Sequence, residues 1–170
     1  IGSRLCPPAT TRASSPNRAT AWGGGGIYVS GASLLMRDST VQYNSAQGRC
    51  SVDCGTGGGI LLDRSHGEVT VTMLRSTIAN NTATSGDGGG IAFQDYVGAN
   101  IALTITDSTI ASNSAPSGGG LSIRAGTATL TNSTLSGNSA SAIGGGFYLD
   151  DGAHANLVHA TITGNTAGVA

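Results

Sequence analysis

Apolar and other residues alternate over short stretches of the chain, and the same alternation returns five times. After each of five glycine triplets, two apolar residues are separated by one residue. A period of two places both apolar side chains on one face of a β-strand. The inward pairs are predicted to be Ile27 and Val29, Ile60 and Leu62, Ile91 and Phe93, Leu121 and Ile123, and Phe147 and Leu149. The residues between them are predicted to face outward: Tyr28, Leu61, Ala92, Ser122 and Tyr148.

Two further strand patterns follow in each repeat. In one, apolar residues stand six and four residues before a Thr, as Leu103 and Ile105 do before Thr109. The other is the step from that Thr to an aliphatic residue, as in Thr109-Ile110, with the aliphatic side chain inward and the Thr outward. Three strands that bury the same face give a coil of triangular section. The outward Thr ladder is Thr40, Thr77, Thr109, Thr134 and Thr161.

The repeat is regular along the chain. The last glycine of each triplet stands at 26, 59, 90, 120 and 146, so the spacing is 33, 31, 30 and 26 residues. Repeats of this length indicate a solenoid, and parallel crossovers are right-handed. We therefore predict an all-β, right-handed parallel β-helix of about five coils with three short strands per coil. Residues 1–21 do not repeat and are expected to be an irregular leader or cap, and residues 22–170 are expected to be the β-helix repeat domain.

An Asn stands four residues after the aligned Thr in every repeat: Asn44, Asn81, Asn113, Asn138 and Asn165. Stacked Asn amides bond to one another and to turn backbone, which favours a structural ladder; the alternative is a ligand-binding row. The glycine triplets are interpreted as corners that need positive φ and close approach of coils. They are not interpreted as a phosphate cradle, because no Lys-Ser/Thr follows them.

Composition narrows the choice of partners. Eight Lys and Arg stand against nine Asp and Glu, which argues against nucleic acid because phosphates need a basic face. No apolar run is long enough for a membrane-spanning helix. Three cysteines leave one over; a Cys50–Cys54 disulfide is predicted, with Cys6 as the rival partner and three free thiols as the other alternative.

Charged residues gather where the first strand of each repeat ends: Asp63-Arg64, Gln94-Asp95, Arg124 and Asp150-Asp151. One interpretation is a polysaccharide or Ca²⁺ site at Asp63, Asp95, Asp150 and Asp151, with His66 or His154 nearby. The favoured interpretation is a solvated turn in which Arg124 lies between Asp95 and Asp150. A second polar row, Asp38, Arg75, Asp107, Asn132 and His159, is expected to be exposed. No Ser/His/Asp triad and no metal-spaced Cys/His set is visible, so no catalytic residue, metal or cofactor is predicted.

The paired motifs resemble the repeats of polymorphic outer membrane proteins, within the wider pectate-lyase-like class of right-handed parallel β-helices. The Gly-Gly-Ala-Ile motif of that family corresponds to Gly-Gly-Gly-Ile/Leu/Phe here. Its Phe-x-x-Asn motif corresponds to Val41…Asn44, Ile78…Asn81, Ile110…Asn113, Leu135…Asn138 and Ile162…Asn165, with smaller aliphatics in place of Phe. The resemblance covers about residues 22 to 167. It implies a bacterial protein, secreted or at the cell surface, often an adhesin.

We therefore expect a non-catalytic extracellular structural or adhesive module, with a surface glycan or a host receptor as a candidate partner. A polysaccharide-active lyase or hydrolase is the runner-up. Ice binding through the Thr ladder is a third alternative, although the neighbouring positions Gln42, Ala79, Ala111, Ser136 and Thr163 are mostly not Thr. The last repeat shows no polar cap, so its open face is expected to be covered, either by further repeats of the chain or by another copy stacking end to end into a fibre.

Overall fold

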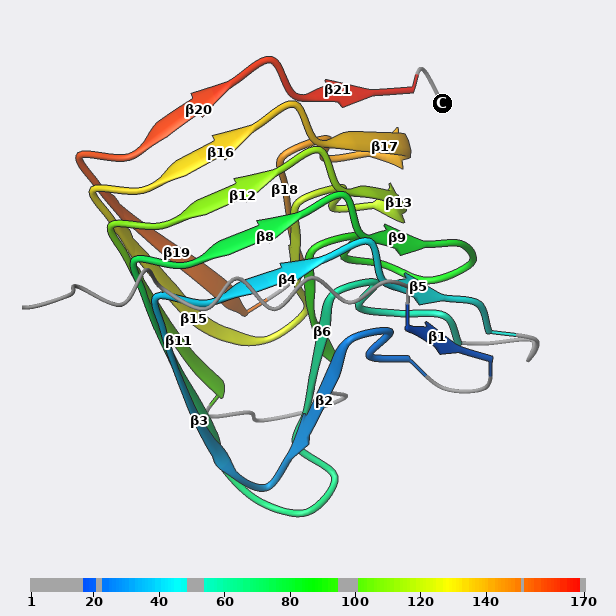
Figure 1. Cartoon of the computed structure of the whole chain (residues 1–170), viewed down its shortest axis with the longest axis horizontal. Coiled ribbons are helices and arrows are strands. Elements are labelled where there is room, and N and C mark those ends of the chain that lie inside the picture. Colours follow the sequence, from blue (N-terminus) through cyan, green and yellow to red (C-terminus); the bar gives the residue numbers. More distant parts are fainter. Residues whose placement is uncertain (1–16, 21–22, 49–53, 95–100, 151, 169–170) are drawn as a thin grey trace, which may run out of the picture.

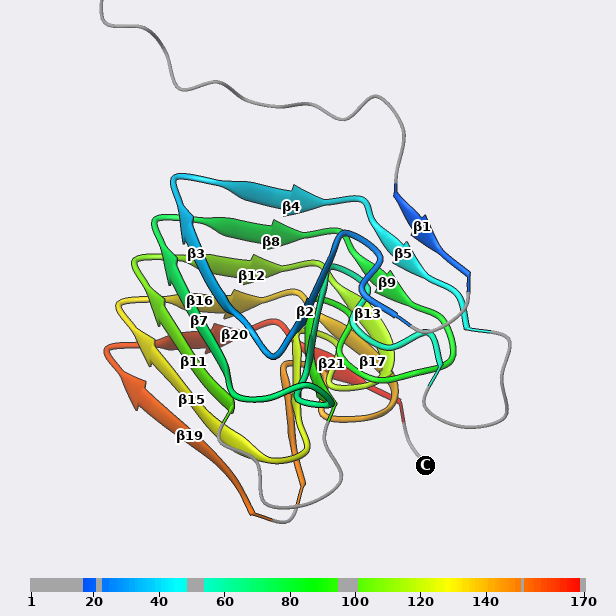
Figure 2. The ribbon, with the colours of Figure 1, turned by 90° about the horizontal axis from the view of Figure 1, so that it is seen from below.

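The computed structural model describes residues 17–20, 23–48, 54–94, 101–150 and 152–168. Every regular element among these residues is a β-strand, and all strand pairs are parallel. The strands stack into successive coils, with the first coil at one end and the last at the other (Figures 1 and 2). This arrangement confirms the predicted parallel β-solenoid.

Four sheets run along the stack, and each takes one strand from every coil. The first sheet holds β2 (Ile27–Ser30), β6 (Ile60–Asp63), β10 (Ile91–Gln94), β14 (Leu121–Ile123) and β18 (Phe147–Leu149). The second holds β3 (Ser33–Arg37), β7 (Val69–Leu74), β11 (Ile101–Thr106), β15 (Gly126–Thr131) and β19 (Ala153–Val158). The third holds β4 (Thr40–Gln42), β8 (Thr77–Ala79), β12 (Thr109–Ala111), β16 (Thr134–Ser136) and β20 (Thr161–Thr163).

The fourth sheet corrects the prediction of three strands per coil. It holds β1 (Arg18–Ala19), β5 (Ser45–Ala46), β9 (Thr82–Ala83), β13 (Ser114–Ser117), β17 (Ser139–Ile143) and β21 (Thr166–Ala167). Its strands are mostly two residues of the type Ser-Ala or Thr-Ala, too short to show any periodicity. Backbone bonds between coils hold them, such as Ser114 N–H to Asn81 O at 2.9 Å. The stacking already includes residues ahead of the first glycine triplet, because β1 pairs with β5.

The core is a stack of identical positions. Ile60, Ile91 and Leu121 are in register on the first sheet, and Val71, Leu103 and Ala128 are in register on the second. All six side chains are buried. Each inward side chain therefore packs against its equivalent on the coils above and below, which explains why small aliphatic residues suffice and few aromatics are needed.

The residues between the inward pairs correct a second prediction. Leu61, Ala92 and Ser122 were expected to face solvent, but they are at most 1 % exposed. The chain that connects the fourth sheet to the first passes over their outer side. A Cβ added to Gly88 would lie 2.6 Å from Ala92 Cβ, and one added to Gly118 would lie 2.8 Å from Ser122 Cβ. The three middle strands of the first sheet, β6, β10 and β14, are therefore buried on both faces, whereas Tyr28 on β2 is exposed as predicted and Tyr148 on β18 is partly buried.

Ser122 is the exception in this second buried layer. Its Oγ is buried and has no hydrogen-bond partner among the described residues, and its register neighbour on β10 is Ala92. An unpaired buried hydroxyl is destabilising, so Ser122→Ala is expected to raise the free energy of unfolding by about 1 kcal/mol. Urea unfolding followed by circular dichroism measures this change. Ser136→Ala on β16, at a partly exposed position, serves as the control and is expected to change stability by less than about 0.5 kcal/mol. A less stable Ser122→Ala protein would contradict the argument.

The five Asn side chains form one hydrogen-bonded ladder at the corner between the third and fourth sheets. Asn81 Nδ2 donates to Asn113 Oδ1, and Asn113 Nδ2 donates to Asn138 Oδ1, each at 3.0 Å. From Asn81 onward each Oδ1 also accepts a backbone N–H from the preceding coil, as Asn113 Oδ1 does from Asn81 at 2.9 Å. Asn17 adds a rung by donating to Asn44 Oδ1 at 2.9 Å. The ladder thus satisfies polar groups that the corner buries.

The three glycines of a triplet serve different purposes. The first has positive φ in every triplet, from +60° at Gly118 to +67° at Gly88 and Gly144. The second and third have no positive φ but lie too close to other atoms for a Cβ. A Cβ on Gly90 would stand 2.5 Å from Gly120 O and 3.0 Å from Asn113 Nδ2. The two repeated motifs of the sequence therefore pack against each other, because the third glycine lies on the Asn ladder.

Candidate functional site

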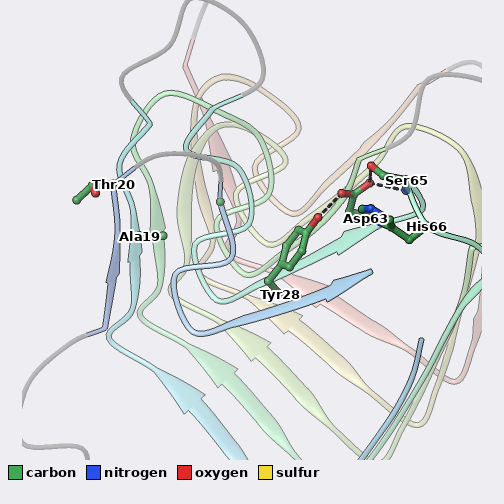
Figure 3. A pocket seen from close by; sticks show the side chains of 7 residues that line it. Ala19, Thr20, Tyr28, Asp63, Ser65 and His66 are labelled. Atoms are coloured by element: carbon green, nitrogen blue, oxygen red, sulfur yellow. Dashed lines mark hydrogen bonds between the residues drawn. The ribbon is translucent and has the colours of Figure 1, made fainter. Parts of the chain in front are cut away.

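A pocket of about 580 Å³ lies beside the first two coils (Figure 3). Tyr28 comes from the middle of β2, and Asp63 from the end of β6 on the next coil. Ser65 and His66 follow Asp63 in the turn that leads to β7. The remaining described lining residues are Ala19, at the end of β1, and Thr20 and Gly23 after it. Figure 3 shows Ala19 and Thr20 on one side of the pocket and Asp63 and His66 on the other, with Tyr28 between them.

Hydrogen bonds hold the two main groups of the pocket in place. The Tyr28 hydroxyl donates to Asp63 Oδ2. Asp63 Oδ1 accepts the Ser65 N–H at 2.8 Å and the Ser65 hydroxyl at 2.6 Å. Burial raises the pKa of Asp63, but the bonds from Ser65 and Tyr28 outweigh it, and the net pKa is below the usual value. Burial and the bond to Asp63 raise the pKa of Tyr28. The negative charge therefore stays on Asp63 and the proton stays on Tyr28.

A serine and a histidine also meet beside the pocket. Ser30 Oγ and His66 Nδ1 share a hydrogen bond at 2.9 Å. Nucleophilic catalysis also requires a third group that orients the histidine. Asp63 is the nearby candidate for that third group, but the bonds that it accepts come from Ser65 and Tyr28. Ser30, His66 and Asp63 are therefore not joined as a catalytic triad.

The predicted acidic site is not brought together around Asp63. In the register of the first sheet, the neighbours of Asp63 are Ser30 and Gln94. Asp150 lies three coils away from Asp63, which is about 14 Å at the usual strand spacing. Asp95 and Asp151 lie outside the described residues. His154 is on β19 in the last coil, opposite Thr127, so only His66 accompanies Asp63. Among the residues that the structure describes, no three His, Cys, Asp or Glu side chains gather as metal ligands do.

Two ion pairs link neighbouring coils elsewhere. Arg75 binds Asp38 through two bonds of 2.7 and 2.8 Å, and these bonds lower the pKa of the exposed Asp38 carboxyl. Arg124 binds Asp87 at 3.0 Å, with both side chains partly buried. The sequence interpretation placed Arg124 between Asp95 and Asp150 and did not consider Asp87. Asp38, Arg75, Asp107, Asn132 and His159 form an exposed row, and all five have positive φ.

The Thr ladder runs along the third sheet, where Thr40, Thr77, Thr109, Thr134 and Thr161 pair in register. Cys54 is disulfide-bonded. Cys6 and Cys50 lie outside the described residues, so the Cys50–Cys54 pairing stays a prediction.

Comparison with known families places this architecture. A family model described as the right-handed β-helix region matches residues 13–170, almost the whole chain. The chain belongs to this right-handed β-helix family. The match establishes the repeat class of the β-helix, while the narrower resemblance to polymorphic outer membrane proteins stays a prediction. No curated protein and no solved structure matches the chain. The part of this β-helix that the structure describes holds no helix long and apolar enough to span a membrane.

Sequence reasoning found Asp63 and His66 but missed Tyr28, Ser65 and the residues after β1. Tyr28 is opposite Leu61 in the register, and Asp63 is two positions further along the same strand. Such diagonal pairs lie within reach of an aromatic side chain. The contact between Tyr28 and Asp63 can therefore be predicted once the register between the coils is known. The stretch Asn17-Arg18-Ala19 repeats the Asn-x-Ala spacing of Asn44-Ser45-Ala46. This spacing indicates β1, although the stretch lies ahead of the first glycine triplet.

Proposed function

We propose that the chain is a non-catalytic, extracellular β-helix module with a structural or adhesive role. The observation that supports this most is how its charged side chains are used. Asp38 binds Arg75, Asp87 binds Arg124, and Asp63 accepts the Tyr28 hydroxyl, each across neighbouring coils. These groups hold one coil on the next.

An oxidising location is supported by chemistry. Cys54 is disulfide-bonded, and disulfides persist mainly in secreted and surface proteins. This supports a location outside the cell or at its surface as part of the proposal; a bacterial source is what the resemblance implies.

The runner-up function is cleavage of a polysaccharide. Glycoside hydrolysis commonly uses two carboxyl groups that face each other across the bond to be broken. The neighbours of Asp63 along its column are a hydroxyl, Ser30, and an amide, Gln94. These neighbours favour a binding or structural role for Asp63 over an acid–base pair.

Digestion assays test the absence of catalysis. The chain is incubated with polygalacturonate and alginate, and released reducing ends and unsaturated products are measured. We expect no release above buffer from the wild-type protein, Asp63→Ala or the control Asp107→Ala. Release that is present in the wild type and in Asp107→Ala but lost in Asp63→Ala would overturn the proposal.

The proposed partner is a second copy of the chain, bound at the last coil. The inward side chains Leu149, Leu157 and Ile162 are 44–47 % exposed, whereas Val29, Met36 and Val41 of the first coil are 5–9 % exposed. The edge strands β18, β19 and β20 pair on one side only. Among the described residues the open apolar face is on the last coil and not on the first, so two last coils facing each other, related by a twofold axis, fit better than a head-to-tail fibre; further repeats of the same chain would cover the same face.

Sedimentation velocity measures this association. Wild-type protein is expected to dimerise at about 100 µM, and Leu157→Asp is expected to be monomeric there. The control Leu35→Asp changes a more exposed residue, on the outer face of β3, and should leave the dimer intact. A monomeric wild type would contradict the self-association.

Ice binding is a second candidate because the second sheet also presents outward Thr side chains, in addition to the Thr ladder on the third sheet. Each of β7, β11 and β15 has three outward positions, and these positions are in register. Of the nine residues there, all are Thr except Leu74 and Ala102. A flat, regular array of hydroxyl and methyl groups is suited to ordering water. Thermal hysteresis that is lost in Thr104→Tyr on β11 but kept in Thr109→Tyr on β12 would assign ice binding to the second sheet.

A further inference from the structure

The pocket beside the first two coils combines one negative charge with an aromatic face. Among the seven described residues that line it, Asp63 is the one that carries a full charge at neutral pH when histidine is neutral. The Tyr28 side chain is about half exposed, at 51 %, and lines the pocket next to that carboxylate (Figure 3). The pocket therefore offers a carboxylate and a π-face side by side.

Both groups are fixed before any ligand arrives. The bond from the Tyr28 hydroxyl to Asp63 Oδ2 holds the ring, and the two bonds from Ser65 hold Oδ1. A site whose groups are already ordered loses less conformational entropy on binding. The described residues of the opposite wall, Ala19, Thr20 and Gly23, are small.

We propose that this pocket binds an organic cation, an ammonium or guanidinium group carried on a short aliphatic stem. Cations are attracted to the face of an aromatic ring and to a nearby carboxylate. The volume of about 580 Å³ is within the range of pockets that hold small ligands. The inference does not depend on the proposed structural role, because it follows from the pocket alone.

Other ligand classes fit these groups less well. An anion would be repelled by Asp63. A Ca²⁺ ion takes six to eight oxygen ligands, whereas Asp63 is the only carboxylate among the described residues of the pocket lining and its Oδ1 already accepts two bonds. A neutral sugar can stack on Tyr28 but gains nothing from the charge, so it is the competing outcome of the test.

Titrations followed by NMR separate these outcomes and the sources of the cation. The probes are tetramethylammonium for free cations, and Nα-acetyl-lysine and Nα-acetyl-arginine methylamides for the side chains of a partner protein. The neutral probes are tert-butanol and methyl glucoside. We expect cation binding with a Kd of about 1 mM, shifting the Tyr28 ring and the Ser65 amide. The preferred cation indicates the source. Neutral probes that bind as tightly as the cations would overturn the proposal, as would no binding at all.

Variants test the two groups separately. Tyr28→Leu is expected to weaken cation binding about tenfold, whereas Tyr28→Phe keeps the ring and most of the affinity. In Asp63→Asn the amide oxygen can still accept the bonds from Ser65, and the amide nitrogen can donate to the Tyr28 hydroxyl oxygen; loss of the charge is expected to weaken binding about fivefold. The control Tyr43→Leu alters another exposed tyrosine, 58 % exposed, outside the pocket lining, and should bind normally. Thermal melts verify that each variant folds. Folded Tyr28→Leu or Asp63→Asn protein that binds like the wild type would disprove the assignment.

Discussion

Replacing Gly89 with alanine is expected to lower the free energy of unfolding by about 4 kcal/mol or more. Gly89 is the middle glycine of its triplet and has no positive φ, so the cause is steric. An added Cβ would lie 2.4 Å from Gly119 O and 2.5 Å from both N and O of Ser114. All three atoms belong to backbone of the neighbouring coil or of the fourth sheet, and no side-chain rotation relieves the contact. The coils would have to separate, breaking bonds such as Gly89 N–H to Gly118 O.

Urea unfolding of the wild type and two variants measures this effect. The matched control is Gly137→Ala, where φ is +61° and the nearest atom to a new Cβ is 3.7 Å away. That variant is expected to lose only about 1 kcal/mol, the cost of a left-handed backbone for alanine. Equal losses in the two variants would show that conformational freedom, and not the spacing of coils, explains the middle glycine.

Asn113→Ala is expected to lower the free energy of unfolding by about 4 kcal/mol. The Asn113 side chain makes four hydrogen bonds in the ladder. Its Oδ1 accepts from the N–H and the Nδ2 of Asn81, and its Nδ2 donates to Ile78 O and Asn138 Oδ1, all at 2.9–3.0 Å. Removal leaves buried donors on Asn81 and the buried carbonyl of Ile78 without their partners. Unpaired buried groups are the costly outcome of losing a hydrogen bond.

The control for this change lies in the same ladder. Asn165 makes three similar bonds, to Asn138 and Leu135, but it is only partly buried in the last coil. Water can replace the lost bonds there, so Asn165→Ala is expected to cost about 1 kcal/mol. If thermal and urea unfolding gave both variants the same loss, burial would not be the reason that the ladder stabilises the coil.

The fold could be predicted because each coil repeats the same constraint. A Val, Ile or Leu at the inward positions packs on its own equivalent, so the period of the pattern determines both the strand and its partner. The fourth sheet could not be predicted in the same way. A two-residue strand such as Thr82–Ala83 has no period, and backbone bonds between coils define it.

The outer layer and the pocket depend on contacts that alternation does not encode. A period of two predicts that Leu61 faces away from its inward neighbours. It does not show that the segments entering the strands through Gly57 and Gly88 cover this outward side of the sheet. The pocket joins Tyr28 and Asp63, which stand 35 residues apart, with a segment after β1 that precedes the glycine repeat. Only the register between coils brings these parts together.

The Asn ladder gives the stack of coils an electric dipole along its axis. From Asn17 to Asn138, each side-chain amide in the ladder donates one N–H to the Asn oxygen of the next coil, so that every oxygen from Asn44 to Asn165 accepts from the coil before it. The amide dipoles are therefore aligned head to tail along the axis, and hydrogen bonds in such a chain polarise one another. The oxygen end is partially negative and the amino end is partially positive, as in the backbone of a helix. A molecule without a single α-helix among its described residues thus carries an axial dipole, built from one side chain per coil.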